Sequence, residues 1–394
     1  MNKILRNLAD IYYGQSPNRI RLENSEYPIF GTGGQVGYAV RPLFEGPAII
    51  VGRKGTLGNP IFTPIGFWAI DTTYAVKPKV GIDAKWLYYH LLNFDLTKLN
   101  EATGVPSINR EYLYQVNINY CTLDEQRKIA EILSTVDNSI EQTEALIQKY
   151  QRIKRGLMQD LLTRGMDEKG NIRNFDRHEF KQTPLGLFPK GWKITTLESV
   201  SEKIADRDHT TPSYVENGII IVSPKDFNEI DEINFETCNR IPLNEHLQNR
   251  KKTDIQPNDI VFTRIGAGLG KACLVSRNMP EFSILHSMAL IRPNMKLTDP
   301  MFFLYLLRSS FIQKQIKNGI QSIGVPDLGL DKIKQLFVFL PEVEEQKKIA
   351  SILYDNDNNI RTNLIEQKKL LNIKQGLMQD LLTGKVRVNA LLEN

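Results

Sequence analysis

Two stretches of the chain carry apolar residues at the spacing of one helical face. In residues 123–163, and again in residues 343–383, isoleucine, leucine and valine recur every three or four positions among charged residues. This spacing places the apolar side chains in one stripe along an amphipathic helix. A helix of this length would be roughly 60 Å long, so one small domain cannot bury its whole stripe. The pattern therefore predicts two long helices that need a further partner.

The other copy is the obvious partner for each helix. In residues 123–163 the acidic residues gather in the N-terminal half and the basic residues in the C-terminal half. This segregation suits the helix dipole and places unlike charges side by side when two such helices run antiparallel. The alternative is two separate amphipathic helices, each lying on its own domain. The apolar residues expected in the contact between the helices are Ile129, Leu133, Val136, Ile140, Leu157, Leu161, Ile349, Leu353, Ile360, Leu377 and Leu381.

The two stretches are copies of one sequence, offset by 220 residues without a gap. They match at 21 of 41 positions, and both end in the identical phrase GLMQDLLT. The match continues upstream, because residues 104–106 and 324–326 both read Gly-Val-Pro. Further upstream, GRKGTLG at 52–58 resembles TRIGAGLG at 263–270. The chain therefore contains a tandem repeat in which a globular module precedes a long helix.

The modules before the helices have a different pattern. Short β-rich runs such as residues 48–51 and 219–222 are separated by glycine turns, and residues 86–92 and 301–307 read as short helices. We therefore predict an α+β fold, with two globular domains of mixed α/β structure separated by two long helices that form an antiparallel coiled coil in a pseudo-two-fold tandem repeat. The expected boundaries are a first domain at 1–120, a helix at 121–165, a linker at 166–190, a second domain at 191–340, a helix at 341–385 and a tail at 386–394.

Composition and charge exclude several classes of protein. No apolar run approaches the length of a membrane span, and the N-terminus lacks the features of a signal peptide. The three cysteines are scattered and predict no disulfide framework, so we expect a cytoplasmic protein. The five histidines lack ligand spacing and predict no metal site. The phrase GAGLGKA at 266–272 fails the spacing of a phosphate-binding loop. We predict no catalytic residue. The net charge of +5 is compatible with a polyanionic partner.

Two helices that end in GLMQDLLT, each after a glycine-rich module, resemble the specificity (S) subunits of type I restriction–modification systems. The phrase PLGLFPKGWKITTLESV at 184–200 is similar to the opening of the family's second target-recognition domain. The phrases YPIFGTGGQVGY at 27–38 and GPAIIVGRKGTLG at 46–58 are similar to parts of the first. The resemblance covers nearly the whole chain.

The resemblance implies a DNA-binding subunit without catalysis or a cofactor of its own. Each recognition domain would read one half of a split double-stranded DNA target, and the helices would set the gap and dock methyltransferase subunits, usually two. Those partners would carry S-adenosylmethionine, and a restriction (R) subunit that uses ATP and Mg²⁺ would complete the complex. Two other classes remain open, namely a catalytic protein with helical appendages and a coiled-coil adaptor that never touches DNA.

The residues expected to contact DNA follow from their chemistry. Arginine can bind guanine with two parallel hydrogen bonds, asparagine or glutamine can bind adenine, and glycine loops let backbone amides approach phosphates. Because the two modules differ in sequence, we expect them to read different half-sites. The candidates are Arg19, Arg21, Thr32, Gln35, Arg53, Lys54 and Asn109 in the first module, and Arg207, His209, Thr210, Lys225, Arg264, Lys271 and Ser322 in the second.

Overall fold

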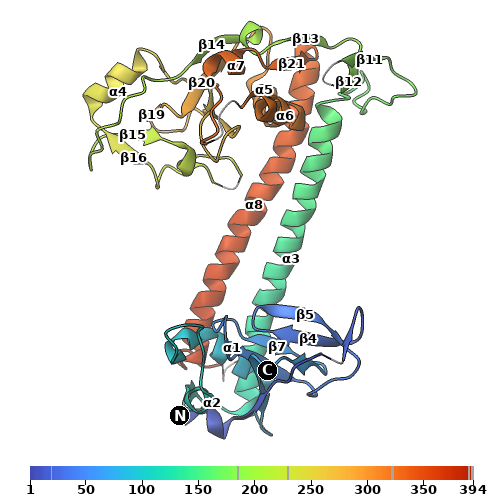
Figure 1. The fold of residues 1–394 in the computed structure, drawn as a ribbon, viewed down its shortest axis with the longest axis vertical. Helices are drawn as coiled ribbons and strands as arrows, with labels where there is room; N and C mark the ends of the chain where they lie inside the picture. The colour runs from blue at the N-terminus through green and yellow to red at the C-terminus, as the bar shows by residue number, and fades with distance from the viewer. Residues whose placement is uncertain (19, 184–185, 229, 321–323, 389–390, 392–394) are drawn as a thin grey trace. The chain divides into compact units, whose positions relative to one another are not determined.

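The computed structural model describes residues 1–18, 20–183, 186–228, 230–320, 324–388 and 391. The chain divides into two compact units, each built around one of the predicted modules. Unit 1 comprises Met1–Ala145 and Asn363–Asn394, and unit 2 comprises Leu146–Thr362. Figure 1 labels many of the helices and strands of both units. Both long helices cross from one unit to the other, so each helix contributes to both.

The described residues of unit 1 form two four-stranded sheets and one pair of strands. The first sheet has the order β2-β9-β6-β7, with antiparallel neighbours throughout. The second has the order β3-β5-β4-β8, in which β4 and β8 run parallel, and β1 pairs with β10. The strands are β1 (Asn2–Ile4), β2 (Ala9–Tyr13), β3 (Arg21–Leu22), β4 (Tyr27–Gly31), β5 (Gly34–Ala39), β6 (Ala48–Gly52), β7 (Ile61–Thr63), β8 (Trp68–Ala69), β9 (Thr73–Pro78) and β10 (Asn117–Asn119).

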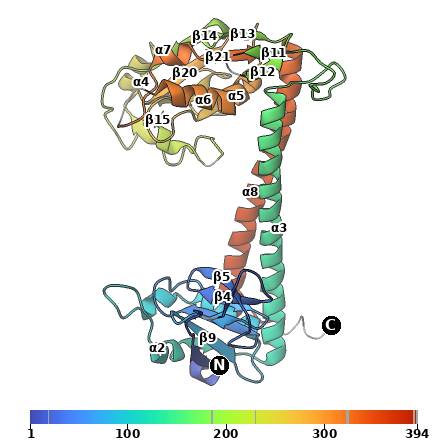
Figure 2. The same cartoon turned by 45° about the vertical axis from the view of Figure 1, so that its right-hand side comes forward.

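The core of unit 1 lies between the first sheet and its helices. Helix α1 (Ala84–Asn93) begins at Asp83, whose carboxylate accepts hydrogen bonds from two backbone amides of the first turn. Trp86 and Leu91 of α1 are fully buried together with strand residues such as Ile49. In Figure 2 the strands of this unit, in blue, lie beside α3. The remaining short helices are η1 (Leu5–Asn7), η2 (Leu96–Leu99) and α2 (Arg110–Tyr114).

Unit 2 contains a four-stranded sheet of order β14-β20-β17-β18, a three-stranded sheet of order β16-β15-β19 and the pairs β13-β21 and β11-β12. Its strands are β11 (Phe180–Thr183), β12 (Gly186–Pro189), β13 (Lys193–Thr196), β14 (Ser201–Ala205), β15 (Ile219–Val222), β16 (Asn239–Ile241), β17 (Ile260–Thr263), β18 (Ala272–Leu274), β19 (Phe282–Ile284), β20 (Met288–Pro293) and β21 (Phe337–Leu340). Its short helices are η3 (Glu198–Val200), η4 (Pro224–Asp226), α4 (Leu243–Arg250), α5 (Pro300–Arg308), α6 (Ser310–Gly319) and α7 (Leu330–Lys334).

The two units share most of their topology. The sheet β2-β9-β6-β7 corresponds to β14-β20-β17-β18, and the parallel pair of β4 with β8 corresponds to that of β15 with β19. The outer pair of β1 with β10 corresponds to that of β13 with β21, and α1 corresponds to α5. The tandem repeat and the mixed α+β modules predicted from the sequence are therefore confirmed.

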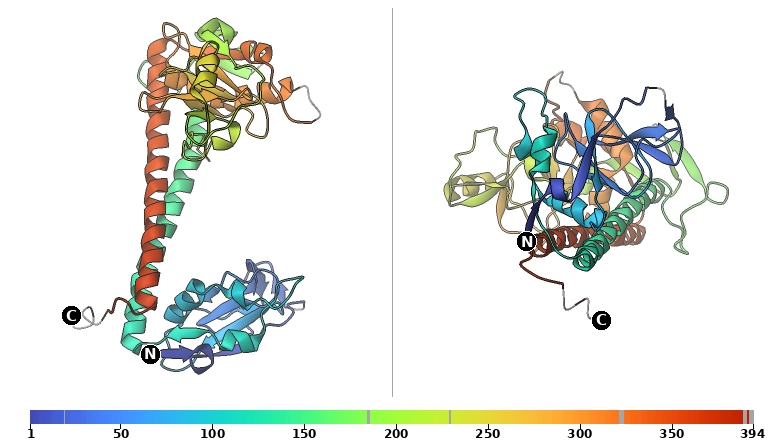
Figure 3. Two further views of the ribbon diagram at one scale, coloured as in Figure 1. Left: turned by 90° about the vertical axis from the view of Figure 1, so that its left-hand side faces the viewer. Right: turned by 90° about the horizontal axis from the view of Figure 1, so that it is seen from below.

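The two repeated segments form the helices α3 (Leu123–Leu161) and α8 (Val343–Leu382). In unit 1, Lys374 of α8 forms an ion pair with Asp137 of α3 at 2.6 Å. In unit 2, Lys154 of α3 forms an ion pair with Asp357 of α8 at 2.7 Å. In both units the helices lie side by side and run antiparallel (Figure 3). The predicted antiparallel helix pair is confirmed.

The apolar stripe packs against the domains as well as between the helices. Ile129 and Leu133 belong to the core of unit 1, and Ile349 and Leu353 belong to the core of unit 2. Each helix therefore begins on its own domain, in addition to pairing with the other helix. Of the remaining stripe residues, Ile140, Leu161, Ile360 and Leu381 are buried, and Val136, Leu157 and Leu377 are half-buried.

Two buried glutamines attach the long helices to the domains before them. Gln126 of α3 accepts a hydrogen bond from the backbone amide of Asp83 and donates one to the carbonyl of Cys121, both at 2.9 Å. Gln346 of α8 accepts from the backbone amide of Asp299 at 2.9 Å. Asp83 and Asp299 are the N-cap residues of α1 and α5. Each glutamine therefore fixes the start of a domain helix against a long helix.

Replacing Gln126 by leucine is expected to lower the free energy of unfolding by about 2 kcal/mol, because two partly buried backbone groups lose their partners. Urea or thermal unfolding measures the change. The exposed Gln142 of the same helix supplies the control, since Gln142→Leu should change stability by less than about 0.5 kcal/mol. Equal stabilities of the two variants would show that Gln126 does not have this role.

Candidate nucleic-acid interface

Three loops of unit 1 meet at Arg53, directly after β6. The backbone amide of Arg53 donates to the carbonyl of Thr72 at 2.8 Å, and the carbonyl of Arg53 accepts from the amide of Ile108 at 2.9 Å. The amide of Gly55 donates to the carbonyl of Pro106 at 2.8 Å. Gly55 has φ of +96°, a conformation that favours glycine. The Gly-Val-Pro motif and the glycine loop, which are far apart in sequence, thus form one loop cluster.

Unit 2 repeats this loop cluster around Arg264, directly after β17. The amide of Arg264 donates to the carbonyl of Ser287, and its carbonyl accepts from the amide of Leu328, both at 2.9 Å. The amide of Gly266 donates to the carbonyl of Pro326 at 2.9 Å, and Gly266 also has φ of +96°. Arg53 and Arg264, which the repeated sequence predicts to be equivalent, therefore have the same backbone surroundings.

The side chains around Arg53 combine cations with an aromatic ring. The Arg53 guanidinium donates to the carbonyl of Asp71 at 2.8 Å and lies 5.2 Å from the ring centre of Tyr13. Arg110 lies 5.1 Å from the same ring. Tyr13 is 46 % exposed, and Arg53 and Arg110 are both half-buried, so the cluster is in part accessible to solvent. Guanidinium groups beside an exposed ring can contact both phosphates and bases.

Tyr74 of β9 supports this cluster from inside the unit. Its ring contacts the ring of Tyr13 edge to face, with 5.2 Å between the centres. Burial, and then the neighbouring Tyr13, raise the pKa of Tyr74 to about 12. The Tyr74 hydroxyl is therefore protonated at neutral pH and donates to the carbonyl of Ile108 at 3.0 Å. A buried residue thus connects the exposed aromatic ring to the loop cluster.

The other predicted residues of unit 1 differ in whether they belong to the loop cluster around Arg53. Lys54 is exposed in the loop itself, and the Thr32 hydroxyl lies 3.7 Å from where a Cβ would stand on Gly55. Asn109 caps α2, because its side-chain oxygen accepts from the amide of Glu111 at 2.9 Å. Within the described residues, no hydrogen bond or ion pair joins the exposed residues Arg21 and Gln35 to this cluster, and Arg19 lies outside the described residues.

In unit 2, carboxylates surround the equivalent arginine. Arg264 forms ion pairs with Asp206 at 3.1 Å and with Asp327 at 2.9 Å, and it also lies 3.2 Å from the ring nitrogen of His209. Its side chain is only 6 % exposed. The Arg264 guanidinium therefore joins the loops of the cluster to one another, whereas the Arg53 guanidinium lies closer to the solvent.

Arg207 is still more deeply buried, with 1 % of its side chain exposed. One of its terminal nitrogens donates to the Thr210 hydroxyl at 2.8 Å and lies 3.3 Å from Glu245. Within the described residues, Nε and Nη1 of Arg207 have no hydrogen-bond partner. Both arginines of unit 2 stay predictions as DNA contacts, and in this structure their side chains support the loops.

Two histidines complete the cluster of unit 2. Burial, followed by the nearby charges of His209, Arg207 and Arg264, lowers the pKa of His286, so its imidazole is neutral at neutral pH. The His286 ring lies 5.1 Å from the ring of His209, which is 59 % exposed. His209 and the exposed Thr210 are therefore the predicted residues of this loop that a ligand can reach without a rearrangement.

Lys225 and Lys271 lie at the neighbouring glycine loop. A Cβ built on Gly268 would stand 3.7 Å from the Lys271 side chain and 3.7 Å from Pro224, which precedes the exposed Lys225. Lys271 also lies 3.6 Å from Asp231. Both lysines are thus close to the loop cluster of unit 2. Ser322 lies outside the described residues.

Sequence reasoning missed five residues of the two clusters, namely Tyr13, Arg110, Asp206, His286 and Asp327. A signal existed for two of them, because Arg110 and Asp327 follow the repeated Gly-Val-Pro motif within four residues. The other three are Tyr13, the last residue of β2, Asp206 in the loop after β14 and His286 in the loop before β20, where the two copies differ too much in sequence to be aligned.

In the described ranges, no group of three or more histidine, cysteine, aspartate or glutamate side chains is arranged to hold a metal ion. No helix within the same ranges is long and apolar enough to span a membrane.

The sequence of the chain is similar to those of known proteins. The family model described as "Type I restriction modification DNA specificity domain" matches residues 2–152 and 189–375, once for each copy of the repeat. The MjaVIII specificity subunit of Methanocaldococcus jannaschii is 26 % identical over 354 residues, which cover 87 % of this chain and 77 % of the relative. The EcoDI specificity subunit of Escherichia coli is 21 % identical, with 94 % of this chain and 88 % of the relative covered.

Two solved structures share the fold. The crystal structure of the S subunit from M. genitalium superposes with a TM-score of 0.69 at 18 % identity, covering 97 % of this chain and 96 % of the other. A structure from a study of complex assembly and conformational transition of the type I R-M system superposes with a TM-score of 0.51 at 15 % identity, covering 98 % of both chains.

Proposed function

The chain belongs to the family of type I restriction–modification DNA specificity subunits, and on this premise we propose that it reads a bipartite, asymmetric DNA target with its two domains. The observation that carries the proposal is the loop cluster that occurs once in each unit, around Arg53 and around Arg264. A repeated backbone arrangement presents different side chains in the two units. Such an arrangement suits two half-sites of different sequence.

The contrast between the clusters supports an asymmetric target. In unit 1 the cluster presents Arg53, Arg110 and an exposed tyrosine ring. In unit 2, carboxylates of Asp206 and Asp327 neutralise Arg264, and the exposed His209 lies beside it. Arginine, histidine and aromatic groups make different contacts with base edges and phosphates. We therefore expect different base preferences in the two half-sites.

We further propose that the chain acts without catalysis, in a complex in the cytoplasm. Methyltransferase subunits would dock on the long helices and supply S-adenosylmethionine. Two copies would bind, because the helix pair presents similar sequences from α3 and α8. Restriction subunits with ATP and Mg²⁺ would complete the complex. Partner subunits would also add to phosphate binding, because residues 191–340 contain 18 basic and 17 acidic residues and are nearly neutral.

A gel-shift experiment with the chain and its cognate methyltransferase tests the proposal. The complex should bind duplexes that contain the split target and should bind poorly to duplexes in which either half is scrambled. The chain alone and the methyltransferase alone should both bind weakly. A complex that assembles but shows no sequence preference would favour the adaptor alternative, and methylation by the chain without its partner would favour the catalytic one.

A further inference from the structure

Each unit contains a cluster of one tyrosine, one aspartate and one lysine, which we call a Tyr–Asp–Lys triad. The triad of unit 1 consists of Tyr89 from α1, Asp137 from α3 and Lys374 from α8. The Tyr89 hydroxyl donates to Oδ2 of Asp137 at 2.7 Å, and Nζ of Lys374 lies 2.6 Å from Oδ1 of the same carboxylate. One carboxylate therefore joins the domain helix, the helix that follows it and the antiparallel partner helix.

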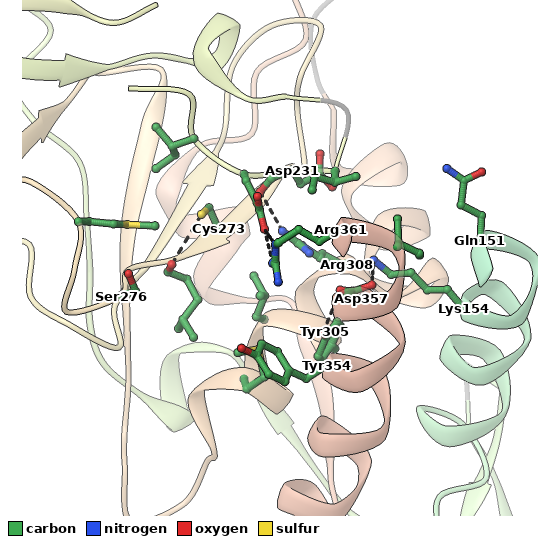
Figure 4. A pocket seen from close by; sticks show the side chains of 18 residues that line it. Gln151, Lys154, Asp231, Cys273, Ser276, Tyr305, Arg308, Tyr354, Asp357 and Arg361 are labelled. Carbon is green, nitrogen blue, oxygen red and sulfur yellow. Dashed lines mark hydrogen bonds and ion pairs between the residues drawn. The ribbon is translucent and has the colours of Figure 1, made fainter. Parts of the chain in front are cut away.

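The triad of unit 2 consists of Tyr305 from α5, Asp357 from α8 and Lys154 from α3. The Tyr305 hydroxyl donates to Oδ2 of Asp357 at 2.9 Å, and Nζ of Lys154 lies 2.7 Å from Oδ1. Figure 4 shows these three side chains in the wall of a cavity of about 510 Å³. The same atoms of the same residue types make the same contacts in both units, with the roles of α3 and α8 exchanged.

The triads differ from the other ion pairs on these helices. Lys128 with Glu131 on α3, and Lys347 with Glu344 on α8, join residues three positions apart on one exposed helix surface. Such pairs contribute little to stability and connect no separate elements. The triad carboxylates are less exposed, with 25 % of the Asp137 side chain and 15 % of the Asp357 side chain accessible. Partial burial strengthens their interactions, because solvent screens them less.

Both tyrosines are suited to act as donors. Tyr89 and Tyr305 are buried at 0 % and 1 % exposure. Burial and the adjacent carboxylate raise the pKa of each phenol, so the hydroxyl stays protonated and donates to the aspartate. The start of each domain helix is fixed separately by Gln126 or Gln346. Each domain helix is thus attached to its long helix at two points, and the lysine extends the second attachment to the other helix.

We propose that the two triads are positioning residues that hold each recognition domain on both helices, and so determine which spacer between half-sites the protein accepts. This inference rests on the proposed function. One additional base pair moves the far half-site by about 3.4 Å and rotates it by about 34° around the duplex axis. A domain that is fixed at its triad cannot follow this movement, whereas a domain with a weakened attachment can tilt toward the displaced half-site.

The test compares DNA duplexes with the optimal spacer and with spacers one base pair shorter and longer. The proteins are complexes of the methyltransferase with the wild-type chain, with Lys154→Met and Lys374→Met combined, or with Tyr89→Phe and Tyr305→Phe combined. Both sets of variants keep the apolar part of each side chain and remove only its charge or its hydroxyl. The wild-type complex should prefer the optimal spacer, and each set of variants should reduce this preference by about tenfold, the factor that one charge-assisted hydrogen bond contributes.

Controls separate positioning from general stability. Lys128→Met and Lys347→Met together should leave the spacer preference unchanged, because they break surface pairs within single helices. Replacing both triad lysines by arginine should restore most of the preference, since the charge returns. The preference is a ratio of affinities measured on one protein sample, so a fraction of unfolded protein cancels out of it.

The possible results distinguish the two proposals. Variants with the wild-type spacer preference would overturn the role of the triads and leave the proposed function intact. A wild-type complex that shows no preference for a split target would overturn the proposed function itself. A spacer preference reduced by about tenfold in the triad variants, with the half-site sequence preference retained, is the result that supports the inference.

Discussion

Replacing Arg53 by alanine is expected to weaken binding to the DNA target by about 5- to 150-fold, because an arginine that contacts a base edge contributes about 1–3 kcal/mol. The effect should be confined to one half-site. Base substitutions in that half-site should lower the affinity of the variant less than they lower the affinity of the wild type. Arg53→Lys distinguishes the two kinds of contact, since lysine keeps the charge for a phosphate but lacks the paired donors that read guanine. Gel shifts with duplexes mutated in one half at a time measure these effects.

The control for this prediction is Arg41, an exposed arginine of the same unit. Arg41→Ala removes the same charge and should lower affinity only through general electrostatics, by about threefold or less at physiological salt. Equal losses for the two variants would mean that Arg53 makes no specific contact with DNA.

Arg264→Ala should behave differently, although Arg264 occupies the equivalent position. Its removal leaves Asp206 and Asp327 close together without the cation between them. We therefore expect a lower melting temperature of the protein together with weaker DNA binding. Arg53→Ala should leave the melting temperature nearly unchanged, since Arg53 donates to a single backbone carbonyl.

Inserting seven residues into both long helices, after Thr143 and after Asn363, is expected to shift the preferred spacer to a longer one. Seven residues are nearly two helical turns, so the apolar stripe keeps its face, and each helix lengthens by about 10 Å. That length corresponds to about three base pairs along the duplex. Binding to the original spacer should fall by at least about tenfold, because both half-sites cannot then be reached together.

The matched control is an insertion of seven residues after Glu168, in an exposed turn of unit 2. It lengthens the chain equally and leaves both helices intact. The preferred spacer should then be that of the wild type. An unchanged spacer in the helix-insertion variant would show that the helices do not determine the distance between half-sites.

The long helices and their pairing could be predicted from the sequence better than the side-chain contacts of the triads and the loop clusters. The helices could be predicted because their periodicity is local, and their pairing followed from charge segregation and from the ungapped repeat of 123–163 in 343–383. The triads could not be predicted, since Tyr89 and Tyr305 lie outside the ungapped register of the long helices. A contact between three elements depends on the packing angle of α1 and α5, which a repeat pattern does not contain.

The limits of prediction at the site are visible at Arg53 and Arg264. Their equivalence followed from the position of each after a buried strand, and the structure gives both the same backbone hydrogen bonds. Their side-chain surroundings could not be foreseen, because Asp206 and Asp327 reach Arg264 from loops far away in sequence. Burial of Arg207 has the same origin, since Glu245 comes from α4, between β16 and β17.

A genome-wide map of methylated bases, from cells that express the chain with its methyltransferase, directly tests whether the two domains read two different half-sites. We expect one asymmetric motif in two parts, separated by a spacer of fixed length. In cells with Arg53→Ala, we also expect one part of the motif to accept bases that the wild-type chain excludes, while the other part stays unchanged. A continuous or palindromic motif, or a map that does not change when the chain is deleted, would contradict the claim that its two domains read two different half-sites.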